Sequence, residues 1–327
     1  AWRLRLPPVS RKHYRPRTPN RAYHRASEAR LTRRVTHLEL TCVFSKDATP
    51  VLTVEPPEEI VFETVDARGE RSVPGRTYVP PPLPPLQALN PATGPVAVQG
   101  AEPGDTLVVD VLEIALCPYG YISAKPDIGV LRDLVATPIA RAVRVHEGRI
   151  LFNESLSFPI RPMIGTIGVA PGGPAVPTAY PGVHGGNMDC NDITVGSRVY
   201  LPVFALGALF ALGDVHASMG DGETSGGGLD ISADVTARVT LAKRKTLRHP
   251  IVETPSQIVV TYNDRDLKRA VRGVVNEAVL LLREQVTLTT EEAIMLVSTA
   301  GDLRISQACD SPIDVTVRLG LPKLFKL

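Results

Sequence analysis

Alternation of apolar and polar residues is the feature that most constrains how this chain can fold. Residues 107–111, 235–241 and 313–319 each place an apolar side chain at every second position. This period of two is that of a β-strand with one buried face. Thirty prolines and 26 glycines provide the tight turns that many short strands need. The sequence therefore predicts a mainly β protein.

Helical spacing occurs only near the C-terminus. Apolar residues recur at helical intervals between about 264 and 285. A second helix is predicted after Thr289, which forms a capping box with Glu292 three positions later. Gly301 is expected to end this helix as a left-handed C′ glycine. Together the two helices predict a small C-terminal α/β subdomain that packs on the β body.

Four parts are predicted along the chain: a basic arm over 1–35, an N-terminal β subdomain over 36–160, a central β subdomain over 161–250 that carries the chemistry, and the α/β subdomain with a closing strand over 251–327. Residues 1–40 contain eleven Lys or Arg and two Glu, although the whole chain has a net charge of only +2. A flexible tail, a transit peptide, or a contact with nucleic acid or anionic lipid each fits such an arm. We take the flexible tail as the expectation.

Composition excludes several classes of protein. No stretch approaches the roughly 18 apolar residues of a membrane-spanning helix. The four cysteines are far apart and form no C-x-x-C pair, which argues against a zinc ribbon or a redox dithiol. Free thiols in a reducing compartment are the simplest interpretation, so a cytoplasmic location is expected.

One segment rich in reactive side chains runs from Gly213 to Glu223. Asp214 and His216 stand two apart at the end of an expected strand, so both side chains point to the same face. A carboxylate and an imidazole together suit zinc or another divalent metal. The glycines around Asp221 permit a backbone path that turns Glu223 back toward the same centre.

A second polar segment, residues 183–189, offers matching groups. His184 is followed by two glycines that permit a tight turn, and Asp189 lies on the strand that comes after it. The side chain of Asn187 both donates and accepts hydrogen bonds, which suits an amide substrate. Asp and Asn beside Gly are also ordinary turn formers. From the residues alone, the alternatives are a divalent metal site in an all-β protein and a pair of structural turns.

Long motifs make the sequence similar to the acetamidase/formamidase family. The resemblance covers about residues 36–323, and its matching stretches follow in order along the chain: "SKDATPVLTVEP" (45–56), "TGPVAVQGAEPGDTLVVDVLEI" (93–114), "PMIGTIGVAP" (162–171), "HGGNMD" (184–189), "GDVHASMGDGE" (213–223) and "AGDLRISQACDSPIDVTVRLGLPK" (300–323). The basic arm has no recognised counterpart in the family, and the proline run over 80–85 is richer than expected.

The resemblance implies a fold of barrel- and sandwich-like β subdomains with a small α/β part. It implies hydrolysis of short aliphatic amides, such as formamide and acetamide, to a carboxylate and ammonia. It also implies a bound divalent metal, with zinc the expected ion, and a homo-oligomer. The polar members of the matched motifs are assigned as metal ligands (His184, Asp189, Asp214, His216), catalytic acids and bases (Glu223, Asp221) and substrate-binding residues (Asn187, Gly186).

Three rival functions are considered. Cys190 directly follows Asp189, so a covalent amidase with a thiolate nucleophile is one. A non-catalytic calcium- or sugar-binding β module is another, because Asp221-Gly222 is a turn of the kind that binds calcium. Its sugar-binding form is poorly supplied with aromatic residues, which make up 5% of the chain, with a single tryptophan in the arm. A nucleic-acid binder would rely on the arm alone.

Overall fold

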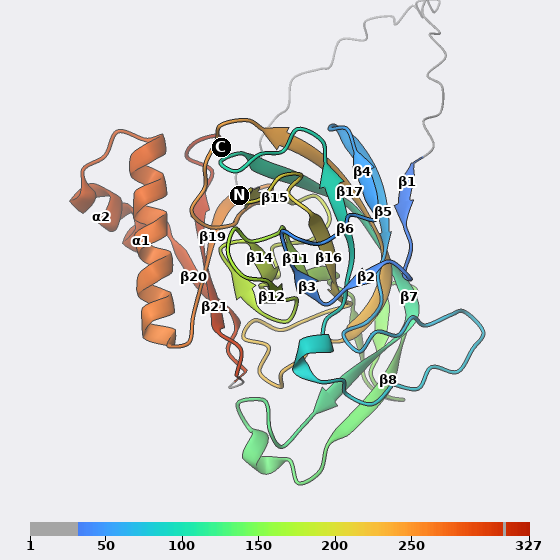
Figure 1. Cartoon of the computed structure of the whole chain (residues 1–327). Coiled ribbons are helices and arrows are strands. Elements are labelled where there is room, and N and C mark those ends of the chain that lie inside the picture. The colour runs from blue at the N-terminus through green and yellow to red at the C-terminus, as the bar shows by residue number, and fades with distance from the viewer. Residues whose placement is uncertain (1–31, 310–311) are drawn as a thin grey trace, which may run out of the picture. The chain divides into compact units, whose positions relative to one another are not determined.

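The computed structural model describes residues 32–309 and 312–327, so the predicted basic arm lies outside the described residues up to Leu31. Strands dominate the described part, and two α-helices lie near the C-terminal end of the chain (Figure 1). The prediction of a mainly β fold with a small helical part is therefore confirmed.

The longest strands form the outer wall of the β body. Strand β7 (Thr106–Ala124) pairs antiparallel with β17 (Asp230–Ala242), from Asp230 opposite Tyr121 to Ala242 opposite Thr106. Strand β5 (Glu58–Glu63) pairs with the other edge of β17. The alternation predicted for 235–241 is realised over most of its length, because Val235, Ala237 and Val239 are buried, whereas the intervening residues and Leu241 are partly exposed.

Four further strands run through the interior of the β body. They are β6 (Ala92–Val98), β11 (Met163–Gly168), β14 (Gly185–Asn187) and β16 (Phe210–His216). Every residue of β11, β14 and β16 is buried. Strand β16 pairs with β11 and β6 and meets β17 where His216 lies opposite Asp230. The two polar segments of the sequence therefore enter the molecule on buried strands.

Shorter strands complete the sheets around this interior. Strand β8 (Ile139–His146) pairs with β7 and continues into the β9–β10 hairpin, which lies with β8 at the lower end of the body in Figure 1. The remaining strands of the body are β1 (Arg33–Val35), β2 (Leu40–Thr41), β3 (Val43–Phe44), β4 (Leu52–Val54), β9 (Arg149–Leu151), β10 (Ser157–Pro159), β12 (Val176–Pro177), β13 (Pro181–Gly182) and β15 (Arg198–Pro202).

The C-terminal part is a sheet covered by two helices. Its strands are β18 (Ile251–Glu253), β19 (Gln257–Asp264), β20 (Asp302–Gln307) and β21 (Val315–Pro322), and β18 joins the body by pairing with β15. Helix α1 (Leu267–Gln285) and helix α2 (Thr290–Ala300) confirm the two predicted helices. The capping box of Thr289 and Glu292 is also confirmed.

Gly301 ends α2 in a different way from the one predicted. Its φ is −79°, so the expected left-handed C′ conformation is wrong. The chain passes directly from the helix into β20 in an extended conformation. Glycine is required there by space, since a Cβ atom at this position would lie 2.4 Å from the carbonyl oxygen of Val297.

Two apolar cores hold these layers together. The larger fills the β body and includes the edge-to-face pair Phe62 and Phe210, whose ring centroids are 5.5 Å apart. The second lies between the helices and the C-terminal sheet and is built from α1 side chains such as Val274 and Leu282. In the described part of the chain, no helix combines the length and the apolar character needed to cross a membrane. The subdomain boundaries at 160 and 250 stay predictions.

Helix α1 packs closely against Tyr262 of β19 at Gly273. Gly273→Ala should lower the thermal midpoint, although alanine is favoured over glycine in a helix by about 1 kcal/mol. The added Cβ atom would lie 2.3 Å from Cε1 of Tyr262, whose ring packs on His249 at a centroid distance of 4.7 Å. Overpacking of this kind costs about 1 to 3 kcal/mol. Asn276→Ala, on the exposed face of the same helix, is the matched control, and a Gly273→Ala midpoint at or above that of the control would contradict the prediction.

Candidate active site

Five ionisable side chains from distant parts of the sequence converge in the β body. Asp214 and His216 end β16, Asp230 begins β17, Asp189 follows β14, and Glu223 lies in the loop between β16 and β17. They form two overlapping groups, Asp189–His216–Glu223 and Asp214–His216–Asp230. In each group, one potential ligand atom per residue lies within 4.8 Å of the others. All five residues are buried.

His216 is the centre of both groups. Its Nε2 atom lies 3.2 Å from Oδ1 of Asp230 and 3.5 Å from Oδ1 of Asp214. Asp214 and His216 thus share one face of β16, as the sequence predicted. Although burial lowers the pKa of His216, the charge of Asp214 and hydrogen bonding to Asp214 and Asp230 raise it well above its ordinary value.

The carboxyl groups around His216 are shielded from water. Burial, and then the charge of Asp214, raise the pKa of Asp189 to about 7. Burial also raises the pKa of Asp214. Burial and the charge of Asp189 raise the pKa of Glu223 well above its ordinary value. Both carboxylate oxygens of Asp189, and Nδ1 of His216, have no hydrogen-bond partner among the described residues. These buried atoms are therefore available to a cation.

Glycines make room for this crowding. A Cβ atom at Gly165 on β11 would lie 2.6 Å from Oδ1 of Asp189 and 2.8 Å from Oδ2 of Asp214. A Cβ atom at Gly228 would lie 2.8 Å from the ring of His216. Only residues without a side chain allow the carboxylates and the imidazole to approach so closely.

Backbone strain is concentrated at the same place. Among the described residues, eight that are not glycine have positive φ, and four of them are Asn90, Asp189, Asp214 and Glu223. Their φ angles lie between 45° and 54°. The left-handed conformation costs about 1 to 2 kcal/mol for an ordinary residue. Such strain is typical of functional sites, where the surrounding structure holds side chains in place.

A small cavity of about 50 Å³ adjoins the cluster. Asp214, His216, Glu223 and Asp230 contribute to its wall, together with the amide side chain of Asn187. The volume is enough for a few water-sized groups, given that one water needs about 10 to 15 Å³ on this measure. The cavity therefore fits a ligand of a few heavy atoms.

Asn187 is held in one orientation at this cavity. Its Oδ1 atom accepts hydrogen bonds from Nδ2 of Asn90 at 3.1 Å and from Oγ1 of Thr166 at 2.9 Å. Nδ2 of Asn90 also donates to Oδ2 of Asp214 at 2.8 Å. Because its oxygen is occupied, Asn187 presents its NH₂ group as a donor for a ligand.

His184 does not join the cluster, contrary to the expectation that it shares a metal with Asp189. It belongs to neither group of potential ligands among the described residues. Its ring packs edge-to-face on Phe44 at 5.1 Å, over Gly182, and burial lowers its pKa to about 4. Two glycines with positive φ, Gly185 and Gly186, stand between His184 and Asn187, so the alternation of a regular strand does not carry over from one side chain to the other.

Gly186 also lies outside the cavity wall in the described part of the chain. Its φ is +83°, and a Cβ atom there would lie 2.1 Å from the carbonyl oxygen of Tyr180. The observed requirement for glycine at this position is thus close backbone packing. The predicted substrate-binding role has no support from the geometry.

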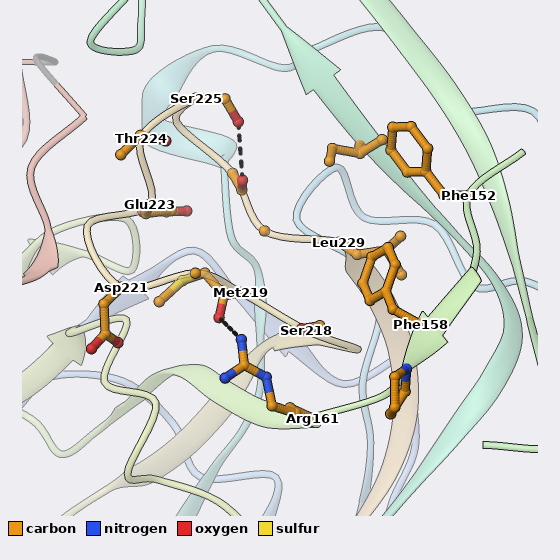
Figure 2. Close-up of a pocket in the computed structure, with 15 residues that line it drawn as sticks. Phe152, Phe158, Arg161, Ser218, Met219, Asp221, Glu223, Thr224, Ser225 and Leu229 are labelled. Atoms are coloured by element: carbon orange, nitrogen blue, oxygen red, sulfur yellow. Dashed lines mark hydrogen bonds between the residues drawn. The ribbon is translucent and has the colours of Figure 1, made fainter. Parts of the chain in front are cut away.

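Asp221 is engaged elsewhere. Its Oδ1 atom accepts hydrogen bonds from Nη2 of Arg318 and Nδ2 of Asn191, both at 2.7 Å. Although burial raises the pKa of Asp221, these hydrogen bonds lower it below its ordinary value. In Figure 2 the Asp221 side chain points in a different direction from that of Glu223. The geometry gives Asp221 the role of an anchor for this loop.

Sequence reasoning missed several residues at the cavity, among them Asp230, Asn90 and Lys125. Asp230 carried a readable signal, since it is an acidic residue between three glycines and an alternating strand. Asn90 and Lys125 lie far from both polar motifs in the sequence, and nothing nearby marks them. Lys125 brings a positive charge to the cavity wall, and burial lowers its pKa.

Asp221→Asn tests the anchoring role. The substitution removes one of the two carboxylates that face the buried guanidinium of Arg318, the other being Asp192 at 2.7 Å. Loss of a hydrogen bond between charged groups costs about 1.5 to 3 kcal/mol, and less for a carboxylate that is two-fifths exposed. We expect a lower thermal midpoint with unchanged metal content. The exposed Asp47→Asn is the control, and loss of bound metal in Asp221→Asn would return this residue to the ligand set.

Comparison with known proteins gives one consistent result. The model of the acetamidase/formamidase family matches residues 36–176 and 172–325. A formamidase of Methylophilus methylotrophus is 26% identical over 233 residues, which are 53% of this chain and 57% of the relative. The chain thus spans about half the length of the curated relatives that it matches.

Solved structures match over more of the chain. A predicted acetamidase/formamidase from Thermoanaerobacter tengcongensis has a TM-score of 0.84 and 34% identity, and covers 89% of this chain and 96% of its own. An acetamidase from Bacillus halodurans has a TM-score of 0.83 and 33% identity, with coverages of 89% and 97%. Motifs, fold and family model agree, and this chain belongs to the acetamidase/formamidase family.

Proposed function

We propose that this chain hydrolyses short aliphatic amides to a carboxylate and ammonia, using a divalent metal. One observation carries the proposal: a buried cluster of carboxylates and a histidine, with unpaired oxygens, adjoins a cavity of about 50 Å³. The names of the relatives, formamidase and acetamidase, support the same substrate class.

The donor set supports a metal. Carboxylates are costly to bury unless they are paired or bind a cation. Asp189, Asp214 and His216 stay in the proposed ligand set, and Asp230 replaces His184, which was predicted to be the fourth ligand. Mixed oxygen and nitrogen donors suit zinc among the divalent ions. A divalent metal bound here would lower the pKa of a water molecule to about 7 and polarise an amide carbonyl.

The side chains of the chain itself then do the remaining work. The NH₂ group of Asn187 donates a hydrogen bond to the carboxamide oxygen of the substrate. Glu223 takes a proton from the attacking water and passes it to the departing nitrogen. Burial raises the pKa of Glu223 above its ordinary value, so this carboxylate takes up a proton more readily than an exposed glutamate does. The overall change is R–CO–NH₂ plus H₂O to R–COO⁻ plus NH₄⁺.

Rival functions have less support. Cys190 is buried, and burial raises the pKa of its thiol to about 12, so it carries little thiolate at neutral pH. Asp221, which suggested a calcium module, is engaged with Arg318 and Asn191. All four cysteines are free thiols, in keeping with the proposed cytoplasmic location. The proposed homo-oligomer rests on the family resemblance.

Glu223→Gln tests the role of the proposed base. Ammonia release from formamide and acetamide should fall by about 10² to 10⁴, the usual contribution of general acid–base catalysis. Bound metal, measured by atomic emission, should remain at the wild-type ratio. Glu147→Gln, at an exposed glutamate far along the chain, is the control. Full turnover in Glu223→Gln would remove this residue from the mechanism, and loss of metal would make it a ligand.

The metal-free chain should show a characteristic pH dependence. The pKa of Asp189 is about 7 in the folded chain, against about 3.9 when unfolded. The protonated form is favoured by folding, so this contribution to stability is complete below about pH 4 and is lost as pH rises through about 7. In the presence of a chelator, the thermal midpoint should therefore fall as the pH is raised from 5 to 8. This fall should be smaller in Asp189→Asn. A midpoint that rises over this range would contradict the placement of Asp189.

A further inference from the structure

A second cavity lies directly beside the small one and has no part in the mechanism above. It is an open cleft of about 480 Å³, within the range of about 300 to 1,000 Å³ that is usual for small-molecule sites. Glu223 and Gly227 line both cavities. A molecule in the cleft can therefore reach the proposed base without leaving the protein surface.

The cleft has two unlike walls (Figure 2). Phe152, Phe158 and Leu229 lie on one side, while Glu223 and Ser225 lie on the other. Phe158 is 42% exposed, so its ring presents apolar surface to the cleft. A ligand with an apolar end and a polar end fits this arrangement, with its polar end toward Glu223.

One hydrogen bond and a glycine hold the polar wall in place. Oγ of Ser225 donates to the carbonyl oxygen of Gly227 at 3.3 Å. A Cβ atom at Gly226 would lie 2.6 Å from the side chain of Ile128. The loop therefore packs closely on the connection between β7 and β8, to which Ile128 belongs. The wall between the two cavities is therefore a defined surface.

Arg161 adds a positive charge to the cleft. Its Nη2 atom donates to the carbonyl oxygen of Met219 at 3.4 Å, and it forms no ion pair with the described residues. Its charge is thus available to a ligand that carries a carboxylate. The hydrolysis of an amide produces such a group at the Glu223 end of the cleft.

We infer that the cleft is a subsite for the apolar acyl group of longer amide substrates, of the arylalkyl and medium-chain alkyl class. This inference rests on the proposed amide hydrolysis. The carboxamide occupies the small cavity, and the acyl group extends past Glu223 and packs on Phe158 and Phe152. After hydrolysis, Arg161 attracts the carboxylate product. Phe158 is then a specificity-determining residue, because it touches only the part of the substrate that acetamide lacks.

Phe158→Ala tests the subsite with two matched substrates. The wild-type chain should hydrolyse both phenylacetamide and acetamide. In Phe158→Ala, kcat/KM for phenylacetamide should fall about tenfold or more, in line with the roughly 10- to 200-fold effects of apolar contacts, while acetamide changes less than about twofold. Leu156→Ala is the control, since Leu156 lies on the same hairpin, is 56% exposed and does not line the cleft.

Binding of phenylacetate, measured by calorimetric titration, separates this inference from the proposed function. Turnover of acetamide with neither turnover of phenylacetamide nor binding of phenylacetate overturns the subsite and leaves the function standing. Equal losses for both amides in Phe158→Ala, at an unchanged thermal midpoint, also overturn it. Binding of phenylacetate that Phe158→Ala and Arg161→Gln weaken, without hydrolysis of any amide, overturns the function and leaves the cleft as a binding site for arylalkyl carboxylates, not as an acyl subsite for substrates. The absence of both amide hydrolysis and phenylacetate binding overturns the subsite and the proposed function together.

Discussion

Mutual repulsion of buried carboxylates is the constraint on which the rest of this structure depends. Asp189, Asp214, Glu223 and Asp230 surround one histidine in a region without bulk water. Burial raises the pKa of Asp189, Asp214 and Glu223, and the negative charges of neighbouring carboxylates add to the effect. In the absence of a cation, protons have to compensate for the repulsion. A divalent ion would neutralise the same repulsion with a fixed ligand geometry. The need to neutralise it connects the fold to the proposed chemistry.

The scaffold can hold this cluster because the reactive side chains stand on rigid strands. Strands β11, β14 and β16 are buried along their whole length, so their backbones have little freedom to relax. Glycines at 165 and 228 leave space where two side chains have to meet. Positive φ angles at the three carboxylates Asp189, Asp214 and Glu223 are maintained by this packing. Backbone strain and close contacts between side chains are therefore concentrated around the carboxylates that would bind a ligand.

Local patterns predicted the regular parts of the fold well. Alternation found the strands, and the capping residue Thr289 placed the start of the second helix correctly. Alternation also placed Asp214 and His216 on one face of a strand, because that inference needs only the geometry of a single strand. What failed was the step from one strand to the next. His184 was assigned to the cluster, although two positive-φ glycines follow it and its side chain packs on Phe44.

Partners distant in sequence explain the other errors. Asp221 was predicted to be catalytic, but its carboxylate binds the guanidinium of Arg318, 97 residues later in the chain. Asp230 enters the site through its register with His216, which no single segment encodes. Asn90 approaches Asp214 from 124 residues earlier in the chain. A sequence motif shows which residue types are present, but the tertiary fold decides which of them face one another.

Arg318, on the last strand of the chain, holds residues of both polar segments in place. From β21 its guanidinium reaches Asp192, just after one polar segment, and Asp221, within the other. In the neighbouring β20, Nε2 of Gln307 donates to the backbone carbonyl of Asn187 at 3.1 Å. These contacts come from the final tenth of the chain. During synthesis on the ribosome, the two motifs therefore emerge long before the residues that lock them together. A nascent chain has all of its cluster residues and still lacks an ordered site until its C-terminal strands have docked.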